Sequence, residues 1–203
     1  PYSSYGHDGI VENSKILNDP TVDVLSKMSI SHAYAGADFV APSDMMDGRV
    51  LKIRQALEKE GFIDTGIMSY GVKYASSLYS PFRDALDSSP GFGDKNTYQM
   101  DFANSNEALN EVNKDIEEGA DILMVKPGLP YIDILNSLSK KFDIPFAVYQ
   151  VSGEYSMLKS AVSKGFLDYD KIVLEQLFSF KRAGASMIAT YHAKEAVKLL
   201  NKI

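Results

Sequence analysis

The chain has 203 residues and carries a formal net charge of -6, from 21 basic and 27 acidic side chains. Because 45% of the residues are hydrophobic and 24% are charged, the composition is that of a folded globular chain and excludes a disordered or collagen-like one. The acidic balance argues against a nucleic-acid partner, and the absence of cysteine excludes disulfides, Cys-type zinc sites and thiol nucleophiles within this chain. No apolar run approaches the roughly 20 residues of a membrane span, so we expect no membrane partner.

Helical patterns alternate with short apolar runs along the chain. The runs are almost continuously apolar, which is typical of strands buried on both faces of a parallel sheet. We predict strands over residues 38–43, 65–73, 121–126, 144–151 and 185–191. The patterns around them predict helices over residues 18–35, 47–60, 105–118, 131–142, 155–164, 169–183 and 193–201.

Three helix-to-strand joints repeat one local pattern. At each of them a helix ends, a glycine turns the chain and a buried strand follows; the glycines are Gly36, Gly119 and Gly184. Such repetition favours a β/α fold, either a (β/α)8 barrel or an open doubly wound sheet. We predict the barrel, because no glycine-rich dinucleotide fingerprint follows a strand and because polar side chains come where strands end.

The predicted fold class is therefore α/β, a (β/α)8 TIM-type barrel in one catalytic domain over residues 1–203. The predicted strands supply about the last five β/α units of such a barrel, so we expect three further strands upstream. The polar, turn-rich stretch over residues 1–9, which lacks an initiator Met, is consistent with that expectation.

The segment from residue 74 to residue 103, called the lid segment below, interrupts the regular alternation. It is rich in Ser, Pro, Gly, Asp and Tyr, and it carries Tyr79, Arg83, Lys95 and Gln99. Irregular connections beyond about 15 residues are uncommon and are usually functional or disordered. A surface excursion is one interpretation; we favour an active-site lid, because a barrel places this connection over its mouth.

Two lysines at strand ends, Lys73 and Lys126, are the strongest candidates for chemistry. Burial and a second ammonium nearby both favour the neutral amine, which can attack a carbonyl and form a Schiff base. The simpler alternative is that both side chains extend from their strand ends into solvent. Hydroxyls at other strand ends, on Ser43, Ser152 and Tyr191, favour the chemical interpretation.

Five motifs stand in a fixed order along the chain: Ala41-Pro-Ser-Asp-Met-Met-Asp-Gly-Arg-Val50, Ser80-Pro-Phe-Arg-Asp-Ala85, Thr97-Tyr-Gln-Met-Asp101, Met124-Val-Lys-Pro-Gly128 and Tyr149-Gln-Val-Ser-Gly-Glu-Tyr155. Together they resemble the porphobilinogen synthase family, also called 5-aminolevulinate dehydratase, and the chain resembles the C-terminal three-fifths of the family sequence. The resemblance implies a (β/α)8 barrel with an N-terminal arm, and a lyase of tetrapyrrole (heme) biosynthesis. It would condense two molecules of 5-aminolevulinate into porphobilinogen with loss of two waters.

The resemblance also implies individual roles. Lys126 matches the lysine that forms a Schiff base with the substrate supplying the propionate side, and Lys73 matches the second lysine, which binds the acetate-side substrate. Ser152 and Tyr191 match the hydroxyls that hold the first substrate's carboxylate. The remaining matches are lid groups for the second carboxylate and pocket-lining positions: Arg83, Gln99, Lys95 (where many members have arginine), Ser43, Tyr79 and Tyr149.

The metal expectations rest on the same resemblance. Asp8 stands where zinc-dependent members have a cysteine, so the resemblance implies Asp8 as a metal residue, no Cys-type zinc site and a magnesium-responsive enzyme. Glu111 matches a ligand of an allosteric magnesium ion at a subunit interface. The plainer alternatives are a loop turn at Asp8 and an exposed helical glutamate at Glu111. The resemblance further implies a homo-octamer, a cytoplasmic or plastid location and no organic cofactor.

Two other functions remain open at this stage. A Schiff-base aldolase on the same barrel would also need a reactive lysine at a strand end. The non-enzymatic alternative is a non-catalytic chain, which binds substrate poorly or acts only in the assembly of a larger protein.

Overall fold

The structure is a computed structural model that describes residues 6–91 and 93–202. It divides into two compact units, residues 1–75 with 87–124 (unit 1) and residues 76–86 with 125–203 (unit 2). A single catalytic domain over residues 1–203 stays a prediction. The loop-like start predicted over residues 1–9 lies outside the described residues for its first five positions.

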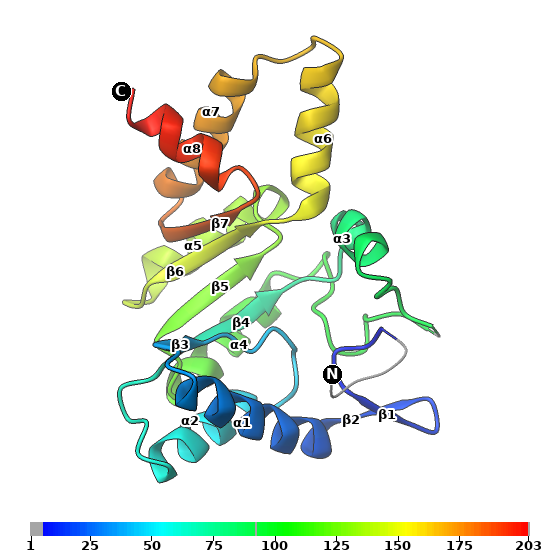
Figure 1. Ribbon diagram of the computed structural model, residues 1–203, viewed down its shortest axis with the longest axis vertical. Helices are drawn as coiled ribbons and strands as arrows, with labels where there is room; N and C mark the ends of the chain where they lie inside the picture. Colours follow the sequence, from blue (N-terminus) through cyan, green and yellow to red (C-terminus); the bar gives the residue numbers. More distant parts are fainter. Residues whose placement is uncertain (1–5, 92, 203) are drawn as a thin grey trace. The chain divides into compact units, whose positions relative to one another are not determined.

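The five predicted strands are all present (Figure 1). They are β3 (Phe39–Val40), β4 (Gly66–Lys73), β5 (Ile122–Lys126), β6 (Phe146–Gln150) and β7 (Ala185–Thr190). Their order in the sheet is β3-β4-β5-β6-β7, and the pairs β3–β4 and β6–β7 are parallel. Sequence order and sheet order coincide with helices between the strands, which is the arrangement of successive β/α units.

The three repeated joints are confirmed as helix ends that turn into strands. Gly36, Gly119 and Gly184 have φ angles of 93°, 100° and 110°. Residues with a Cβ rarely adopt these left-handed conformations, so the glycines let the chain leave each helix and enter the next strand directly.

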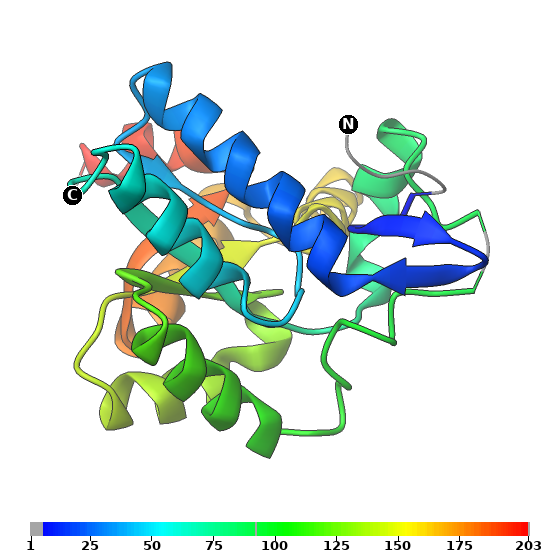
Figure 2. The same ribbon diagram turned by 90° about the horizontal axis from the view of Figure 1, so that it is seen from below.

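Unit 1 packs α1 (Asn18–Tyr34), α2 (Arg49–Lys59) and α4 (Asn106–Glu117) with β3 and β4. Figure 2 shows α1 and α2 running side by side. The apolar side of α2 provides Val50, Ile53 and Leu57, all fully buried, as its helical spacing predicts.

The start of α2 corrects the sequence prediction by two residues. Asp47 does not open the helix; its backbone N–H donates to Asn18 Oδ1 at 2.8 Å, outside α2. Gly48, with φ of 72°, is the N-cap residue instead. Asn18, distant in sequence, binds both the N–H and the carbonyl oxygen of the Asp47 backbone, which holds Asp47 in the loop before α2.

The sequence prediction missed a hairpin in unit 1. Strand β1 (Ile10–Glu12) pairs with β2 (Lys15–Leu17) in antiparallel fashion. The two turn residues between them, Asn13 and Ser14, have φ of 50° and 57°. Positive φ at both central positions is the geometry of a two-residue hairpin turn.

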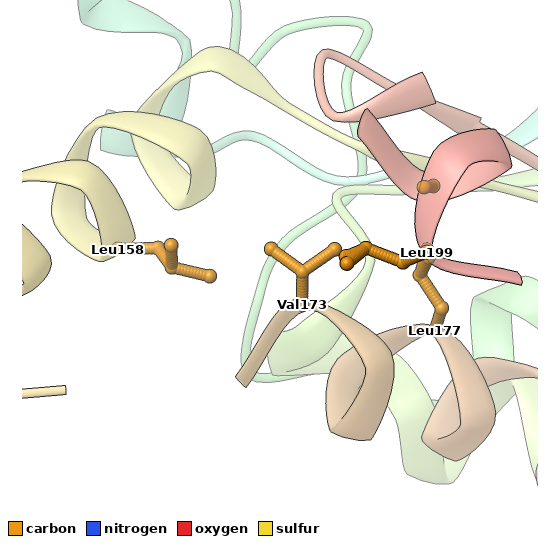
Figure 3. Close-up of a cluster of buried hydrophobic side chains, with 5 residues drawn as sticks. Leu158, Val173, Leu177 and Leu199 are labelled. Carbon is orange, nitrogen blue, oxygen red and sulfur yellow. The ribbon is translucent and has the colours of Figure 1, made fainter. Parts of the chain in front are cut away.

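The described part of unit 2 contains five α-helices, most of them at or near their predicted ranges. They are α3 (Ser80–Ala85), α5 (Ile132–Lys141), α6 (Ser152–Ser163), α7 (Tyr169–Arg182) and α8 (Ala193–Leu200). Figure 3 shows an apolar cluster that joins α6, α7 and α8, formed by Leu158, Val173, Leu177, Leu199 and Ala196. Helix α6 begins three residues before its predicted start at Tyr155.

The lid segment is more regular than predicted. It contains the 3-10 helix η1 (Ser77–Tyr79) followed directly by α3. Its later part returns to β4, where Met100 pairs with Tyr74 and donates its N–H to Lys73 O at 3.1 Å. The prediction that the whole segment is irregular is therefore wrong, whereas its closure over the site as a lid stays a prediction. Among the described residues, no helix is both long and apolar enough to cross a bilayer.

Candidate active site

Lys73, the last residue of β4, lies buried in a polar group of unit 1, with 6% of its surface exposed. Its Nζ donates to Asp8 Oδ2 at 2.9 Å and also to the backbone oxygen of Ser43. Ser43, a predicted pocket-lining residue, therefore contacts Lys73 through its backbone carbonyl oxygen. These contacts orient the amine at the strand end, where the sequence prediction put it.

Asp8 bridges two lysines. Its Oδ2 accepts from Lys73, and its Oδ1 accepts from Lys95 Nζ at 2.8 Å. Burial by itself raises the pKa of Asp8, but the two neighbouring ammonium groups and their hydrogen bonds outweigh burial and lower the pKa to about 2. Asp8 is therefore an anion at any physiological pH, and it acts as a counter-ion to two cations.

The return of the lid segment to β4 brings Lys95 and Gln99 to this group. Gln99 is 4% exposed, and its backbone N–H donates to Lys95 O at 2.9 Å. Its side-chain Oε1 is buried without a hydrogen-bond partner among the described residues. Because a buried amide oxygen normally has a donor, this atom is suited to accept one from a ligand.

A buried ionic network that the sequence analysis missed lies next to Lys73. Arg49 donates to Ser69 Oγ at 2.9 Å and lies 3.7 Å from carboxylate oxygens of both Asp44 and Asp115. Ser69 in turn donates to Asp115 Oδ2 at 2.6 Å. Asp44 and Arg49 belong to the motif over residues 41–50, but only the fold brings them to Ser69 on β4 and Asp115 on α4.

Lys126, the last residue of β5, lies against two aromatic rings of unit 2. Its Nζ is 4.5 Å from the ring centre of Tyr149 and 5.3 Å from that of Tyr79. The hydroxyl of Tyr79 also donates to Lys126 O at 3.3 Å. The negative faces of the two rings favour a positive charge at this nitrogen.

Ser152 and Arg83 belong to the same unit. The Oγ of Ser152, which is 8% exposed, accepts from the backbone N–H of Phe82 at 3.1 Å. Arg83 lies over the ring of Tyr79, with its Cζ 5.2 Å from the ring centre. The contact between α3 and the first residue of α6 therefore brings the arginine near the rings that hold Lys126.

Tyr191 joins the group through its ring, 6.3 Å from that of Tyr149. Burial, together with its hydrogen bond to Tyr149, raises the pKa of Tyr191 to about 12. The phenol therefore stays protonated and can donate a hydrogen bond to an anion.

The predicted site residues thus form two groups, one in each unit. Unit 1 brings together Lys73, Ser43, Lys95, Gln99 and Asp8, and unit 2 brings together Lys126, Tyr79, Tyr149, Ser152, Arg83 and Tyr191. Glu111 belongs to neither group.

Glu111 lines a cleft of about 840 Å³ in unit 1, with Asp47, Asp101 and Glu107. It lies 3.4 Å from Lys114 Nζ, and burial raises its pKa. The oxygen donors along the cleft suit magnesium chemically. No group of three or more possible ligands occurs among the residues that the structure describes.

Asp8 fits a metal less well. Both of its carboxylate oxygens already accept hydrogen bonds from ammonium groups, those of Lys73 and Lys95. A cation there would have to displace at least one lysine, so we derive no chemical step through a metal at Asp8.

Comparison with known proteins decides the family. The family model described as Delta-aminolevulinic acid dehydratase matches residues 1–199. The chain belongs to the delta-aminolevulinic acid dehydratase family. It is 59% identical over 197 residues to the delta-aminolevulinic acid dehydratase of Methanothermus sociabilis, covering 97% of this chain and 61% of the relative. The Bacillus subtilis family member is 55% identical over 199 residues, covering 98% of this chain and 61% of the relative.

A solved dehydratase structure confirms the predicted fold class. The crystal structure of delta-aminolevulinic acid dehydratase (porphobilinogen synthase) from Toxoplasma gondii ME49, in complex with the reaction product porphobilinogen, matches with a TM-score of 0.95 at 58% identity. The match covers 97% of this chain and 57% of that one. The chain thus has the α/β fold of about five units of a (β/α)8 barrel, and it spans about three-fifths of its relatives' length.

Proposed function

We propose that this protein carries out the porphobilinogen synthase reaction, the condensation of two molecules of 5-aminolevulinate with loss of two waters. The observation that carries the proposal is the Lys126 amine at the end of β5, 4.5 Å from the ring centre of Tyr149 and 5.3 Å from that of Tyr79. Membership of the family supports it, as does the product bound in the Toxoplasma relative.

The chemistry at Lys126 begins with its amine in the neutral form. The ammonium that the rings favour first gives up one proton, and the neutral amine adds to the substrate ketone. One proton returns as the ketone oxygen leaves as water, so that ammonium and ketone together give a protonated imine and water. The faces of Tyr149 and Tyr79 stabilise that cation as they stabilise the ammonium. Ser152 and Tyr191 would donate hydrogen bonds to the carboxylate of the same substrate.

The group around Lys73 would bind the second substrate. Within unit 1, Lys95 would provide positive charge for its carboxylate, and Gln99 would provide an amide. The role of Arg83 towards the same carboxylate follows from the family resemblance alone. Since Asp8 is such a weak base, it would not take the proton from Lys73; its role is to stabilise positive charge at the strand end, including that of a protonated imine.

Borohydride trapping tests the proposal, with the protein expressed from its complete gene. Reduction in the presence of 5-aminolevulinate should attach the substrate to Lys126, and peptide mass spectrometry should locate it there. Lys126→Ala should abolish both this adduct and turnover, whereas Lys140→Ala, an exposed lysine on α5, should leave both intact. An unchanged adduct in Lys126→Ala would contradict the assignment. Trapping of simple aldehydes but not of 5-aminolevulinate would favour the aldolase alternative.

The finer properties are proposals on the same basis. We propose magnesium, bound with Glu111 as one ligand, as an activating ion, supported by the further carboxylates of Asp47, Asp101 and Glu107 along the same cleft. Lyase classification, homo-octameric assembly and a cytoplasmic or plastid location follow from the family resemblance alone.

A further inference from the structure

Glu154, in the first turn of α6, is a buried carboxylate that the chemistry above does not use. It is 2% exposed and accepts three backbone hydrogen bonds. Its Oε2 accepts from Val151 N at 2.7 Å and from Gly128 N at 3.1 Å, and its Oε1 accepts from Leu129 N at 2.7 Å. The bond to Val151 is the ordinary one from the third helical residue to the N-cap. The other two bonds reach a different loop.

The three amides flank the two predicted substrate-binding positions of unit 2. Gly128 and Leu129 follow Lys126 directly after Pro127, which has no N–H of its own. Val151 directly precedes Ser152. One carboxylate therefore ties the end of β5, which carries the amine, to the end of β6, which carries the hydroxyl.

Helix capping alone does not explain this position. An exposed Ser, Thr or Asp at the N-cap satisfies helix amides without burying a charge, and burial of an ionised carboxylate is costly unless it is fully hydrogen-bonded. Burial raises the pKa of Glu154 even though three N–H groups oppose that change. The turn is also closely fitted, because a Cβ at Gly128 would lie 2.8 Å from Phe180 Cζ and 3.2 Å from Glu154 Oε1.

We propose that Glu154 is a positioning residue, which fixes the Lys126 amine relative to the Ser152 hydroxyl so that one substrate can engage both. A keto acid has its ketone and its carboxylate a fixed few bonds apart, so the two protein groups must keep a matching separation. Three charge-assisted hydrogen bonds to two strand ends provide that restraint. The inference rests on the proposed function, because it takes Lys126 as the Schiff-base lysine.

The test compares Glu154→Gln with Glu175→Gln, an exposed glutamate on α7. The glutamine has nearly the same size, but it has one acceptor oxygen and turns an NH2 group towards backbone donors. The readouts are the rate of borohydride-trapped adduct formation with 5-aminolevulinate on Lys126, kcat, KM and the far-UV circular dichroism. Wild type is measured first; if it forms no adduct on Lys126, the proposed function fails, independently of Glu154.

We expect Glu154→Gln to remain folded and to form the Lys126 adduct about 10- to 100-fold more slowly, with a raised KM. Glu175→Gln should match wild type. Glu154→Asp keeps the charge and both oxygens but is one methylene shorter, so it should recover part of the lost rate. A folded Glu154→Gln that traps at the wild-type rate overturns the proposal. If that variant does not fold, Glu154→Asp decides by the same criterion; failure of both to fold assigns Glu154 to folding and also overturns the proposal.

Discussion

At the scale of single residues, charge compensation determines what the polar group around Lys73 can do. Asp8 balances two buried lysines, and their ammonium groups keep its carboxylate in the ionised form. Removing the carboxylate takes a shared counter-ion away from two buried cations, which is far more costly than removing one partner of an exposed pair.

Asp8→Asn should therefore lower the free energy of unfolding by about 2 kcal/mol at neutral pH. The pKa of Asp8 is lowered from 3.8 to about 2, so this stabilisation is complete above the unfolded value and is lost as the pH falls from about 4 towards 2. Urea unfolding at a series of pH values measures the difference between variant and wild type.

The matched control for this measurement is Asp23→Asn. Asp23 pairs with Lys52 at 3.4 Å, but both side chains are more than half exposed, so this substitution should cost little at any pH. Equal effects of the two substitutions, or a difference that does not shrink towards pH 2, would contradict the account of Asp8.

At the scale of elements, the helices of unit 1 are held by their apolar faces. Leu57 and Leu51 lie on the same helix, α2, yet Leu57 is fully buried while Leu51 is 44% exposed. The two leucines therefore offer the same chemical change in two environments, which isolates the contribution of burial.

Leu57→Ala should destabilise the protein by about 2 to 5 kcal/mol, because it removes packed methyl groups and leaves a cavity. Leu51→Ala should cost about 0.5 kcal/mol or less. Thermal and urea unfolding of both variants provide the comparison. Similar losses for the two variants would mean that α2 is not held by this face.

Sequence patterns located most elements, and the differences have local physical causes. Periodicity places α2 within two residues, because its buried positions recur every three to four residues. It does not detect the hairpin of β1 and β2, since three-residue strands are too short to show a period. The sequence also placed the start of α6 three residues too late, at Tyr155. Glu154 was therefore not recognised as a residue of the first turn, where its carboxylate accepts from Val151 N.

At the scale of the whole molecule, the chain spans about three-fifths of the relatives that it matches. The proposed magnesium response belongs to this scale, because the resemblance places the ion at an interface between subunits. The feature of this chain that supports the magnesium proposal is the cleft that Glu111 lines.

Glu111→Gln should abolish stimulation by magnesium in the protein expressed from its complete gene. The physical reason is that an amide oxygen is a weaker ligand than a carboxylate for a hard cation. Glu117→Gln, an exposed position on the same helix, should respond to magnesium as wild type does. Activity titrated with magnesium chloride after chelation measures both. Loss of activity that only zinc restores would argue against the magnesium proposal.

The sequence by itself determined the order of the five sheet strands and of most helices, the family, and both strand-end lysines, because periodicity and contiguous motifs are local properties of a chain. Only the tertiary structure decided which groups contact those lysines. Asp8 reaches Lys73, and Glu154 reaches Gly128, across 65 and 26 positions of sequence. Such pairs form because a buried charge or amide must find a partner wherever the fold provides one, and no local pattern encodes that partner.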